Sequence, residues 1–213
     1  MSPDEHTEPD EHTGSSRIRL FLAVELPDPV LRELERITSM LQASLGVGRW
    51  VPPANRHVTV KFLGWTWPRL LPWVEREVEL VARTEQAFHA CLTGLGTFPP
   101  GSRKARVLWA GIDDPDERLA RLASGLDAAL AREFEPERRA FSAHATLARF
   151  DPPVQVPLES VEPHVEPFAI EAVTLFLSHL KRPAPVYESI ASFPLGPVGQ
   201  RPPSSPQRKH DTR

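Results

Sequence analysis

Apolar residues recur along the chain with two different periods, which predict alternating strands and helices. Residues 18–26 form an apolar run typical of a buried strand. Leucine and isoleucine then follow at helical spacing from Asp28 to about Leu45. Asp28, with a proline behind it, is suited to a helix start, and Gly46 to a helix end. We therefore expect a strand followed by one long helix.

The two periods continue to about residue 193 and predict an α+β fold. Strands are expected at 49–51, 57–63, 88–98, 107–112, 143–149, 168–180 and 186–193, and helices at 68–83 and 119–130. The strands are too numerous, and too often paired as hairpins, for a doubly wound parallel sheet. Antiparallel sheets with helices on their outer faces fit better, with an approximate two-fold rhythm along the chain.

Two short stretches share one pattern of histidine, apolar residue, threonine and apolar residue. They are 57–60 (His-Val-Thr-Val) and 144–147 (His-Ala-Thr-Leu), one in each half of the chain. Side chains alternate between the faces of a strand, so His57 and Thr59 share one face and His144 and Thr146 share another. If the strands face each other across a cleft, they offer two imidazoles with two hydroxyl donors between them.

This pattern favours acid–base chemistry on a small polar group. One histidine would act as base and the other as acid, and the threonines would donate hydrogen bonds to developing charge. The alternative is a pair of structural histidines, since about one His-x-Ser/Thr triplet is expected by chance in a chain with 8 histidines. Two such triplets in strand-like context are harder to explain in that way. No carboxylate cluster accompanies the histidines, so no metal or other cofactor is expected.

Composition and charge place these motifs in an ordinary globular chain of 213 residues. We expect residues 17–196 to form one domain between disordered tails, acidic at 1–16 and rich in Pro, Ser and Arg at 197–213. A single cysteine, no apolar run of membrane-spanning length and an acidic N-terminus predict a soluble, cytoplasmic protein. We also expect a monomer.

The distribution of charge narrows the class of partner. The net charge of −3 comprises −5 in residues 1–16, +3 in residues 197–213 and about −1 in the body between them. A near-neutral body is not typical of a protein that binds long duplexes, which requires a basic face. If the partner is nucleic acid, an end or a short single strand is expected.

With these motifs in place, the sequence resembles the two-histidine (2H) phosphoesterases. It is most similar to the bacterial and archaeal RNA 2′,3′-cyclic phosphodiesterases, also called 2′-5′ RNA ligases. The resemblance spans roughly residues 17–196 and rests on both motifs and on the stretches 19–23 (RLFLA), 49–52 (RWVP), 55–64 (NRHVTVKFLG), 106–109 (RVLW) and 141–149 (FSAHATLAR). It implies a bilobal fold whose motif strands line a central cleft.

The resemblance also implies a reaction. The expected activity is hydrolysis of RNA 2′,3′-cyclic phosphate ends to 2′-phosphates, with His57 as acid and His144 as base. The residues alone leave open which histidine has which role. Two positions depart from the family pattern: Ala143 stands where proline is usual and Ala145 where a larger residue is usual. Both lie outside the His/Thr face, so we expect altered packing rather than lost chemistry.

Three further residues are candidates for substrate binding. The resemblance implies that Arg149 holds the phosphate, although strand alternation would point it away from His144 and Thr146, so the strand must bend or end first. Lys61 shares the predicted face of His57 and would add positive charge, and Phe21 would stack a terminal base. The alternatives are a surface ion pair for Arg149, an exposed strand lysine for Lys61 and a core position for Phe21.

Two other functions stay open. One is a 2H relative that acts on small cyclic nucleotides or on 2′-5′ linkages. The other is a non-catalytic module that binds RNA ends. Two complete His-x-Thr motifs argue against the second, because a binding module needs no pair of titrating imidazoles.

Overall fold

The computed structural model describes residues 16–114, 116–158 and 163–197. Apart from Ser16 and Pro197, the two tails predicted to be disordered lie outside these residues. Along the chain the elements are β1 (Ile18–Glu25), α1 (Asp28–Leu45), β2 (Arg49–Trp50), β3 (His57–Thr66), α2 (Leu71–Thr84), β4 (Phe88–Phe98), β5 (Ala105–Asp113), α3 (Arg118–Leu130), β6 (His144–Val154), β7 (Phe168–Ile170), β8 (Ala172–His179) and β9 (Val186–Pro194). Two 3₁₀ turns, at Pro53–Asn55 and Pro68–Leu70, precede β3 and α2.

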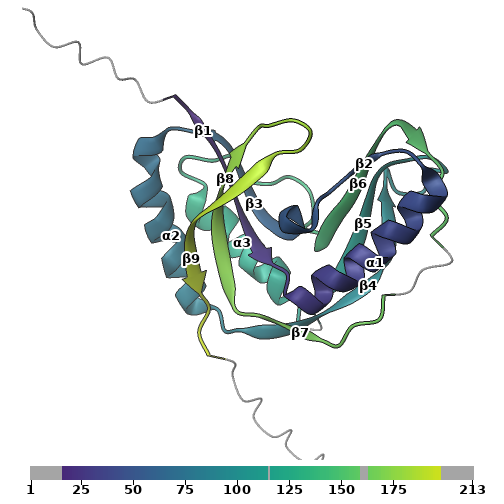
Figure 1. The fold of residues 1–213 in the computed structure, drawn as a ribbon. Helices are drawn as coiled ribbons and strands as arrows, with labels where there is room; N and C mark the ends of the chain where they lie inside the picture. The colour runs from purple at the N-terminus through teal and green to yellow at the C-terminus, as the bar shows by residue number, and fades with distance from the viewer. Residues whose placement is uncertain (1–15, 115, 159–162, 198–213) are drawn as a thin grey trace, which may run out of the picture.

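The nine strands of the described residues form one curled sheet. Its order is β7-β4-β5-β6-β3-β1-β8-β9, with β2 added to β6, and all the pairs between named strands are antiparallel. The pairing between β3 and β6 consists of one residue pair, Val58 with Ala145. The α+β class is confirmed, and the two expected sheets are the halves of this sheet, joined at that pair (Figure 1).

The helices lie on the outside of the two halves. In Figure 1, α1 leaves β1 and lies along the half that contains β4, β5 and β6, whereas α2 and α3 lie on the half that contains β3, β8 and β9. The predicted stripes of apolar residues point inward, and Leu34, Ile37, Leu122, Leu126 and Leu130 are fully buried. Burial of such a side chain contributes about 1.5–3 kcal/mol to the stability of the fold. The helical spacing of apolar residues in the sequence therefore marks the side of each helix that packs in the core.

An aspartate lies at the start of α1, and another lies just before α3. Asp28 is the first residue of α1, and Pro27 occupies the capping position in front of it. Asp114 lies four residues before α3, where its carboxylate accepts hydrogen bonds from the backbone N–H groups of Arg118 and Leu119. Asp114 therefore satisfies two N–H groups of the first turn of α3, as a capping carboxylate does.

The apolar run 168–180, predicted as one strand, is two strands in different halves of the sheet. β7 pairs with β4 and β8 pairs with β1, so the chain crosses from one half to the other at Glu171. The Glu171 carbonyl accepts a hydrogen bond from Leu195 instead of taking part in either ladder, with N and O 2.8 Å apart. The prediction was wrong because apolar strand residues do not record which strand they pair with.

Candidate active site

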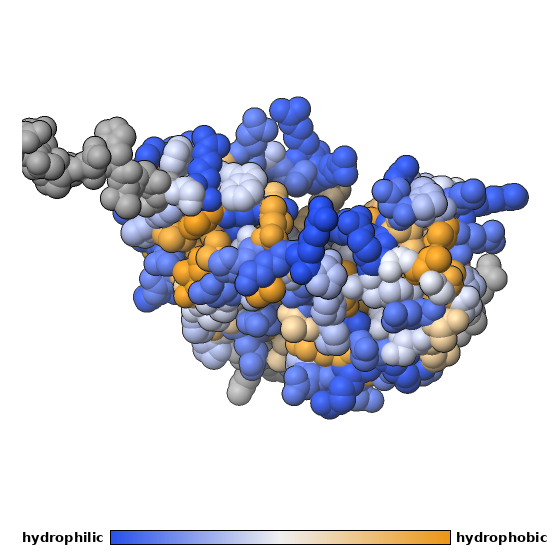
Figure 2. All heavy atoms as spheres, turned by 45° about the horizontal axis from the view of Figure 1, so that its top comes forward, coloured by the Kyte–Doolittle hydropathy of each residue, from blue (hydrophilic) through white to orange (hydrophobic). Residues whose placement is uncertain are grey.

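A cavity of about 460 Å³ opens between the two halves of the sheet, and both motif strands line it. Its described wall comprises the motif residues His57, Thr59, His144 and Thr146, the arginines Arg19, Arg49 and Arg149, the aromatic residues Phe21, Trp50, Phe62 and Tyr187, and Val51, Pro52, Asn55 and residues 183–185. Hydrophilic side chains surround the hollow between the halves (Figure 2). Within the described wall no residue carries a carboxylate, so the cavity favours an anion.

A β-bulge interrupts each motif strand at the same place. In β3, Thr59 pairs with Ala23 and Lys61 with Leu22, which leaves Val60 as the extra residue. In β6, Thr146 pairs with Trp109 and Ala148 with Leu108, which leaves Leu147 extra. An extra residue resets the alternation of side chains that follow it. The fourth residue of each motif therefore changes which later side chains reach the cavity.

The bulge in β6 resolves the conflict over Arg149. Simple alternation points Arg149 away from Thr146, but after the bulge at Leu147 the two share a face, and both line the cavity. Arg49 of β2 is the cross-strand partner of Arg149 and lines the cavity beside it. Two guanidinium groups therefore stand next to the second motif.

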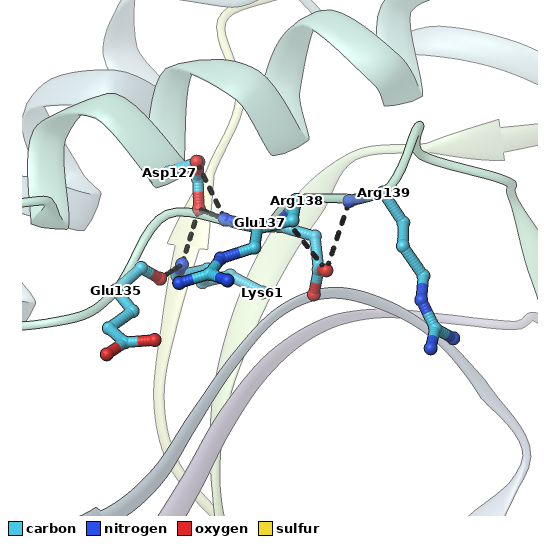
Figure 3. A network of polar contacts seen from close by, with 6 residues as sticks. All are labelled: Lys61, Asp127, Glu135, Glu137, Arg138 and Arg139. Carbon is cyan, nitrogen blue, oxygen red and sulfur yellow. Dashed lines mark hydrogen bonds and ion pairs between the residues drawn. The ribbon is translucent and has the colours of Figure 1, made fainter.

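The bulge in β3 has the opposite effect on Lys61, and its predicted place in the cleft is wrong. Lys61 is only 6% exposed and points away from the cavity, where its ammonium group forms an ion pair with Asp127 of α3. It also donates a hydrogen bond to the Glu135 carbonyl, with N and O 2.8 Å apart (Figure 3). Phe62, one residue later, takes the place in the cavity wall that alternation assigns to Lys61.

His57 is held by its own strand and by the loop before it. Its Nδ1 lies 2.8 Å from the Asn55 carbonyl, which only accepts hydrogen bonds, so Nδ1 carries the proton. In the neutral ring Nε2 is then the acceptor, and the Thr59 hydroxyl, 3.1 Å away, donates to it. Arg56, buried beside His57, fixes this loop by bonds to the Val51 carbonyl and to side chains of α1.

His144 repeats the same arrangement in the other half. Its Nδ1 lies 2.8 Å from the carbonyl of Ser142, again two residues earlier in the chain. The same reasoning places its proton on Nδ1 in the neutral ring and leaves Nε2 as the acceptor. Both imidazoles are therefore held through Nδ1, and both keep Nε2 for chemistry in the cavity.

Phe21 supports His57 and does not present a surface for a base. Its ring stacks on the imidazole with centroids 4.8 Å apart and also packs against Phe176 and Tyr187. Phe21 is only 3% exposed, so neither face of its ring is available to a substrate. The prediction that Phe21 stacks a terminal base is corrected on this ground, although the residue does border the cavity.

The surroundings of His57 make it less basic than a free histidine. Burial lowers its pKa from the ordinary value of 6.5 to about 4, the Asn55 carbonyl opposes this shift, and nearby His144 adds to it. Burial also raises the pKa of Tyr187 above its ordinary value, against the opposing influence of Arg19 and Arg149. His57 is therefore neutral at pH 7, and the Tyr187 hydroxyl keeps its proton.

Comparison with known proteins decides the family. A family profile described as LigT like Phosphoesterase matches residues 24–109 and 111–187. This chain belongs to that family.

Curated relatives of the LigT-like family carry one common name. The chain is 35% identical over 190 residues to the RNA 2′,3′-cyclic phosphodiesterase of Thermus thermophilus, a match that covers 84% of this chain and 90% of the relative. It is 29% identical over 187 residues to the protein of that name from Geobacillus stearothermophilus, where it covers 84% of this chain but spans only 58% of the relative.

Solved structures of related proteins have the same fold. The Thermus thermophilus protein TT0787 superposes with a TM-score of 0.68 at 31% identity, covering 84% of this chain and 98% of the other. Escherichia coli LigT complexed with 3′-AMP superposes with a TM-score of 0.66 at 25% identity, covering 85% of this chain and 99% of the other. The likeness therefore extends over nearly all of each solved structure.

Sequence reasoning missed several residues of the LigT-like cavity. Arg19, Arg49 and Asn55 lie in the stretches that carried the resemblance, yet none was assigned a role there. Tyr187 gave no local signal, because it reaches the cavity from β9, far along the chain. The Asn55 side chain donates to the Pro185 carbonyl, 2.7 Å away, and so connects the loop before His57 to the segment before β9.

Two further findings concern metal binding and membrane-spanning helices among the described residues. No group of three or more His, Cys, Asp or Glu residues among them is placed to hold a metal ion. None of their helices combines the length and the apolar character needed to cross a membrane.

Replacing Lys61 tests the orientation that the bulge gives it. Lys61→Met is expected to lower the free energy of unfolding by about 2–4 kcal/mol, because it leaves the partly buried Asp127 carboxylate without its cation. The measurement is urea unfolding, with Lys104→Met, at an exposed position in the β4–β5 turn, as control. Equal stability of the two variants would show that the Lys61 ammonium does not depend on Asp127.

The lowered pKa of His57 predicts a pH dependence of stability. Between pH 6.5 and 4, His57 binds a proton in the unfolded chain but not in the folded protein. The free energy of unfolding therefore falls as the pH falls through this window. Relative to His57→Gln, the wild type should lose about 3 kcal/mol between pH 7 and pH 4. His89→Gln removes an exposed histidine and serves as control. Parallel pH profiles for wild type and His57→Gln would contradict the lowered pKa.

Proposed function

We propose that this chain hydrolyses RNA 2′,3′-cyclic phosphate ends to 2′-phosphomonoesters by metal-independent acid–base catalysis between His57 and His144. One observation carries the proposal: two His-x-Thr motifs with the same Nδ1–carbonyl bond line one cavity, whose described wall has arginines and no carboxylate. The names of the curated relatives support the same reaction.

The reaction needs two proton transfers at opposite ends of the phosphorus centre. One imidazole takes a proton from water through Nε2 while the water oxygen bonds to phosphorus. The bond from phosphorus to the ribose O3′ breaks, and the other imidazole, protonated at Nε2, gives its proton to O3′. The phosphate stays on O2′, and a second turnover requires the proton to return from one histidine to the other by way of solvent.

The other cavity residues bind the charge of the phosphate. Once His57 is protonated at Nε2, the Thr59 hydroxyl no longer donates to that ring. Thr59 and Thr146 would then donate hydrogen bonds to the non-bridging oxygens, where negative charge grows in the transition state. Arg149 and Arg49, adjacent across β6 and β2, supply the planar donors that suit phosphate oxygens. The protonated hydroxyl of Tyr187 is a further donor in the same wall.

The substrate itself supplies the protonation state that the reaction needs. Because burial lowers the pKa of His57 to about 4, this histidine is neutral at pH 7. A bound phosphate places a negative charge near the ring, and an adjacent anion raises a histidine pKa by about 1–3 units. The acid role that the resemblance implies for His57 therefore depends on bound phosphate, and His144 would act as base.

Supporting observations concern the partner and its setting. Escherichia coli LigT has been solved with 3′-AMP, a nucleotide with a phosphate on its ribose. The cavity described here is built from one chain, so the proposed reaction needs no second subunit, and we expect a monomer. A single cysteine fits a cytoplasmic enzyme that acts on RNA.

Turnover of a substrate panel in the presence of EDTA tests the activity. An RNA oligonucleotide with a 2′,3′-cyclic phosphate end, a mononucleoside 2′,3′-cyclic phosphate, a 3′,5′-cyclic nucleotide and a 2′-5′-linked dinucleotide are compared. Hydrolysis of the first two to 2′-phosphates at an unchanged rate in EDTA is expected. Activity that EDTA abolishes and a divalent cation restores would refute the mechanism, and selective turnover of either of the last two would assign a different substrate.

Histidine variants test the two imidazoles as one unit. His57→Ala and His144→Ala should each lower kcat by about 10²–10⁴, and the double variant should lose far less than the product of both effects. Wild-type kcat/KM should be bell-shaped in pH, since one imidazole must be neutral and the other protonated. The exposed His89→Ala serves as control. A folded His57→Ala protein with near-normal turnover would leave only a structural role for that motif.

A further inference from the structure

A row of side chains continues from the cavity along β1 and β3 toward the far end of these strands. Phe21 pairs with Phe62 at the cavity. A second bulge in β3 leaves Leu63 as an extra residue, so the next same-face pair outward is Arg19 with Trp65. Beyond it, Arg17 and Trp67 flank the ends of the two strands. From Phe21 to Arg17 this row spans about 14 Å at about 3.4 Å per residue.

The aromatic members of this row are unusually exposed. Phe62 is 49% exposed, Trp65 57% and Trp67 38%, and all three come from one short stretch of the chain. Large apolar side chains that gather on a surface, rather than occurring singly, commonly mark a binding site. These rings lie outside the core, so they are available to contact a bound ligand.

Arginines accompany each end of the row. The guanidinium carbon of Arg19 lies 4.6 Å from the Phe62 ring centroid, and those of Arg17 and Arg69 lie 4.9 and 5.4 Å from the Trp67 ring. We call these six residues the aromatic–arginine track: Arg17, Arg19, Phe62, Trp65, Trp67 and Arg69. Rings that stack bases beside cations that hold phosphates are the usual means of binding single-stranded nucleic acid.

The track is continuous with the active site. A second cavity, of about 420 Å³, is lined by Arg17, Trp65 and Trp67, and Phe62 belongs to the wall of both cavities. Glu133 and Glu135 also line this second cavity. Because carboxylates repel phosphate, a nucleic-acid backbone is expected on the arginine side, with its bases toward the rings.

We propose that the aromatic–arginine track binds the single-stranded RNA nucleotides that precede the reacting 2′,3′-cyclic phosphate. This inference rests on the proposed function and extends it to chain length. The enzyme therefore selects single-stranded ends of several nucleotides over mononucleotides, because only the longer substrate reaches beyond Phe62 to Trp65 and Trp67.

Selectivity for chain length is the first test, made with the full chain. The ratio of kcat/KM for a single-stranded pentanucleotide with a 2′,3′-cyclic phosphate end to that for a mononucleoside 2′,3′-cyclic phosphate should be at least about tenfold. Trp65→Ala should lower this ratio by about tenfold through KM, whereas Trp65→Tyr should largely restore it, since either ring stacks a base. A purely structural role for Trp65 would instead change Tm and both substrates alike.

Paired arginine variants separate the track from general attraction between RNA and positive charge. Arg17→Ala/Arg69→Ala removes two charges from the track, and Arg76→Ala/Arg83→Ala removes two from the outside of α2. Only the track pair should lower the pentanucleotide to mononucleotide ratio and reduce the salt dependence of pentanucleotide binding. Equal effects of both pairs would overturn a specific track.

Binding keeps this inference distinct from the proposed activity. Fluorescence anisotropy with a labelled pentanucleotide that ends in a 3′-phosphate measures affinity without turnover. If no cyclic phosphate is hydrolysed but Trp65→Ala still weakens binding about tenfold, the proposed function fails and the track stands. If both cyclic phosphates are hydrolysed with no length preference and Trp65→Ala binds normally, the track is wrong and the function stands. If Trp65→Ala changes the oligomeric state but not the affinity for the pentanucleotide, the surface is a protein–protein contact and the track is also wrong.

Discussion

The active site depends on two β-bulges, one at the fourth residue of each motif. Consecutive side chains of a regular strand point to opposite faces, yet Val60 and Lys61 are both buried away from the cavity, as are Leu147 and Ala148. The bulges allow this and turn the next residues, Phe62 and Arg149, toward the cavity. In β6 the second buried residue is a small alanine, whereas in β3 it is a lysine, which requires a carboxylate at the end of its buried stem. The ion pair with Asp127 is therefore a consequence of the same backbone feature that shapes the cavity.

The two halves meet where small side chains let them approach. Val58 and Ala145 form the one residue pair between β3 and β6, and Ala145 also faces Ala110 on the next strand. Both residues of the junction are fully buried, on the face opposite the histidines. Ala145 does not line the cavity, so its small side chain affects the packing beneath the site rather than the His/Thr face. The junction also brings His57 and His144 into the wall of one cavity.

Sequence periodicity predicts the elements of this fold better than the details of its site. The helix stripes around Leu34 and Leu122 and the two motif strands follow from apolar spacing, because burial imposes that spacing directly. The orientations of Lys61 and Arg149 do not follow from apolar spacing. A bulge leaves the pattern of residue types unchanged and appears only in the register between neighbouring strands. The break at Glu171 was missed for a related reason: strand residues encode a buried face but not a partner. Phe21 was misplaced because β1 is buried on both faces, so alternation gave no sign of which side chains reach solvent.

The two motif strands share a bulge and an Nδ1–carbonyl bond but give their histidines different surroundings. His57 lies among Phe21, Phe176 and Tyr187, whereas His144 meets the rings of Phe98 and Trp109 in edge or tilted contacts. Two imidazoles in identical surroundings would have equal pKa values, whereas acid–base catalysis needs one neutral and one protonated imidazole. Burial of His57 lowers its pKa and so breaks the equivalence that the repeated motif would otherwise create. In the proposed mechanism a bound phosphate anion opposes this lowering of the His57 pKa, so the acid role proposed for His57 depends on bound substrate.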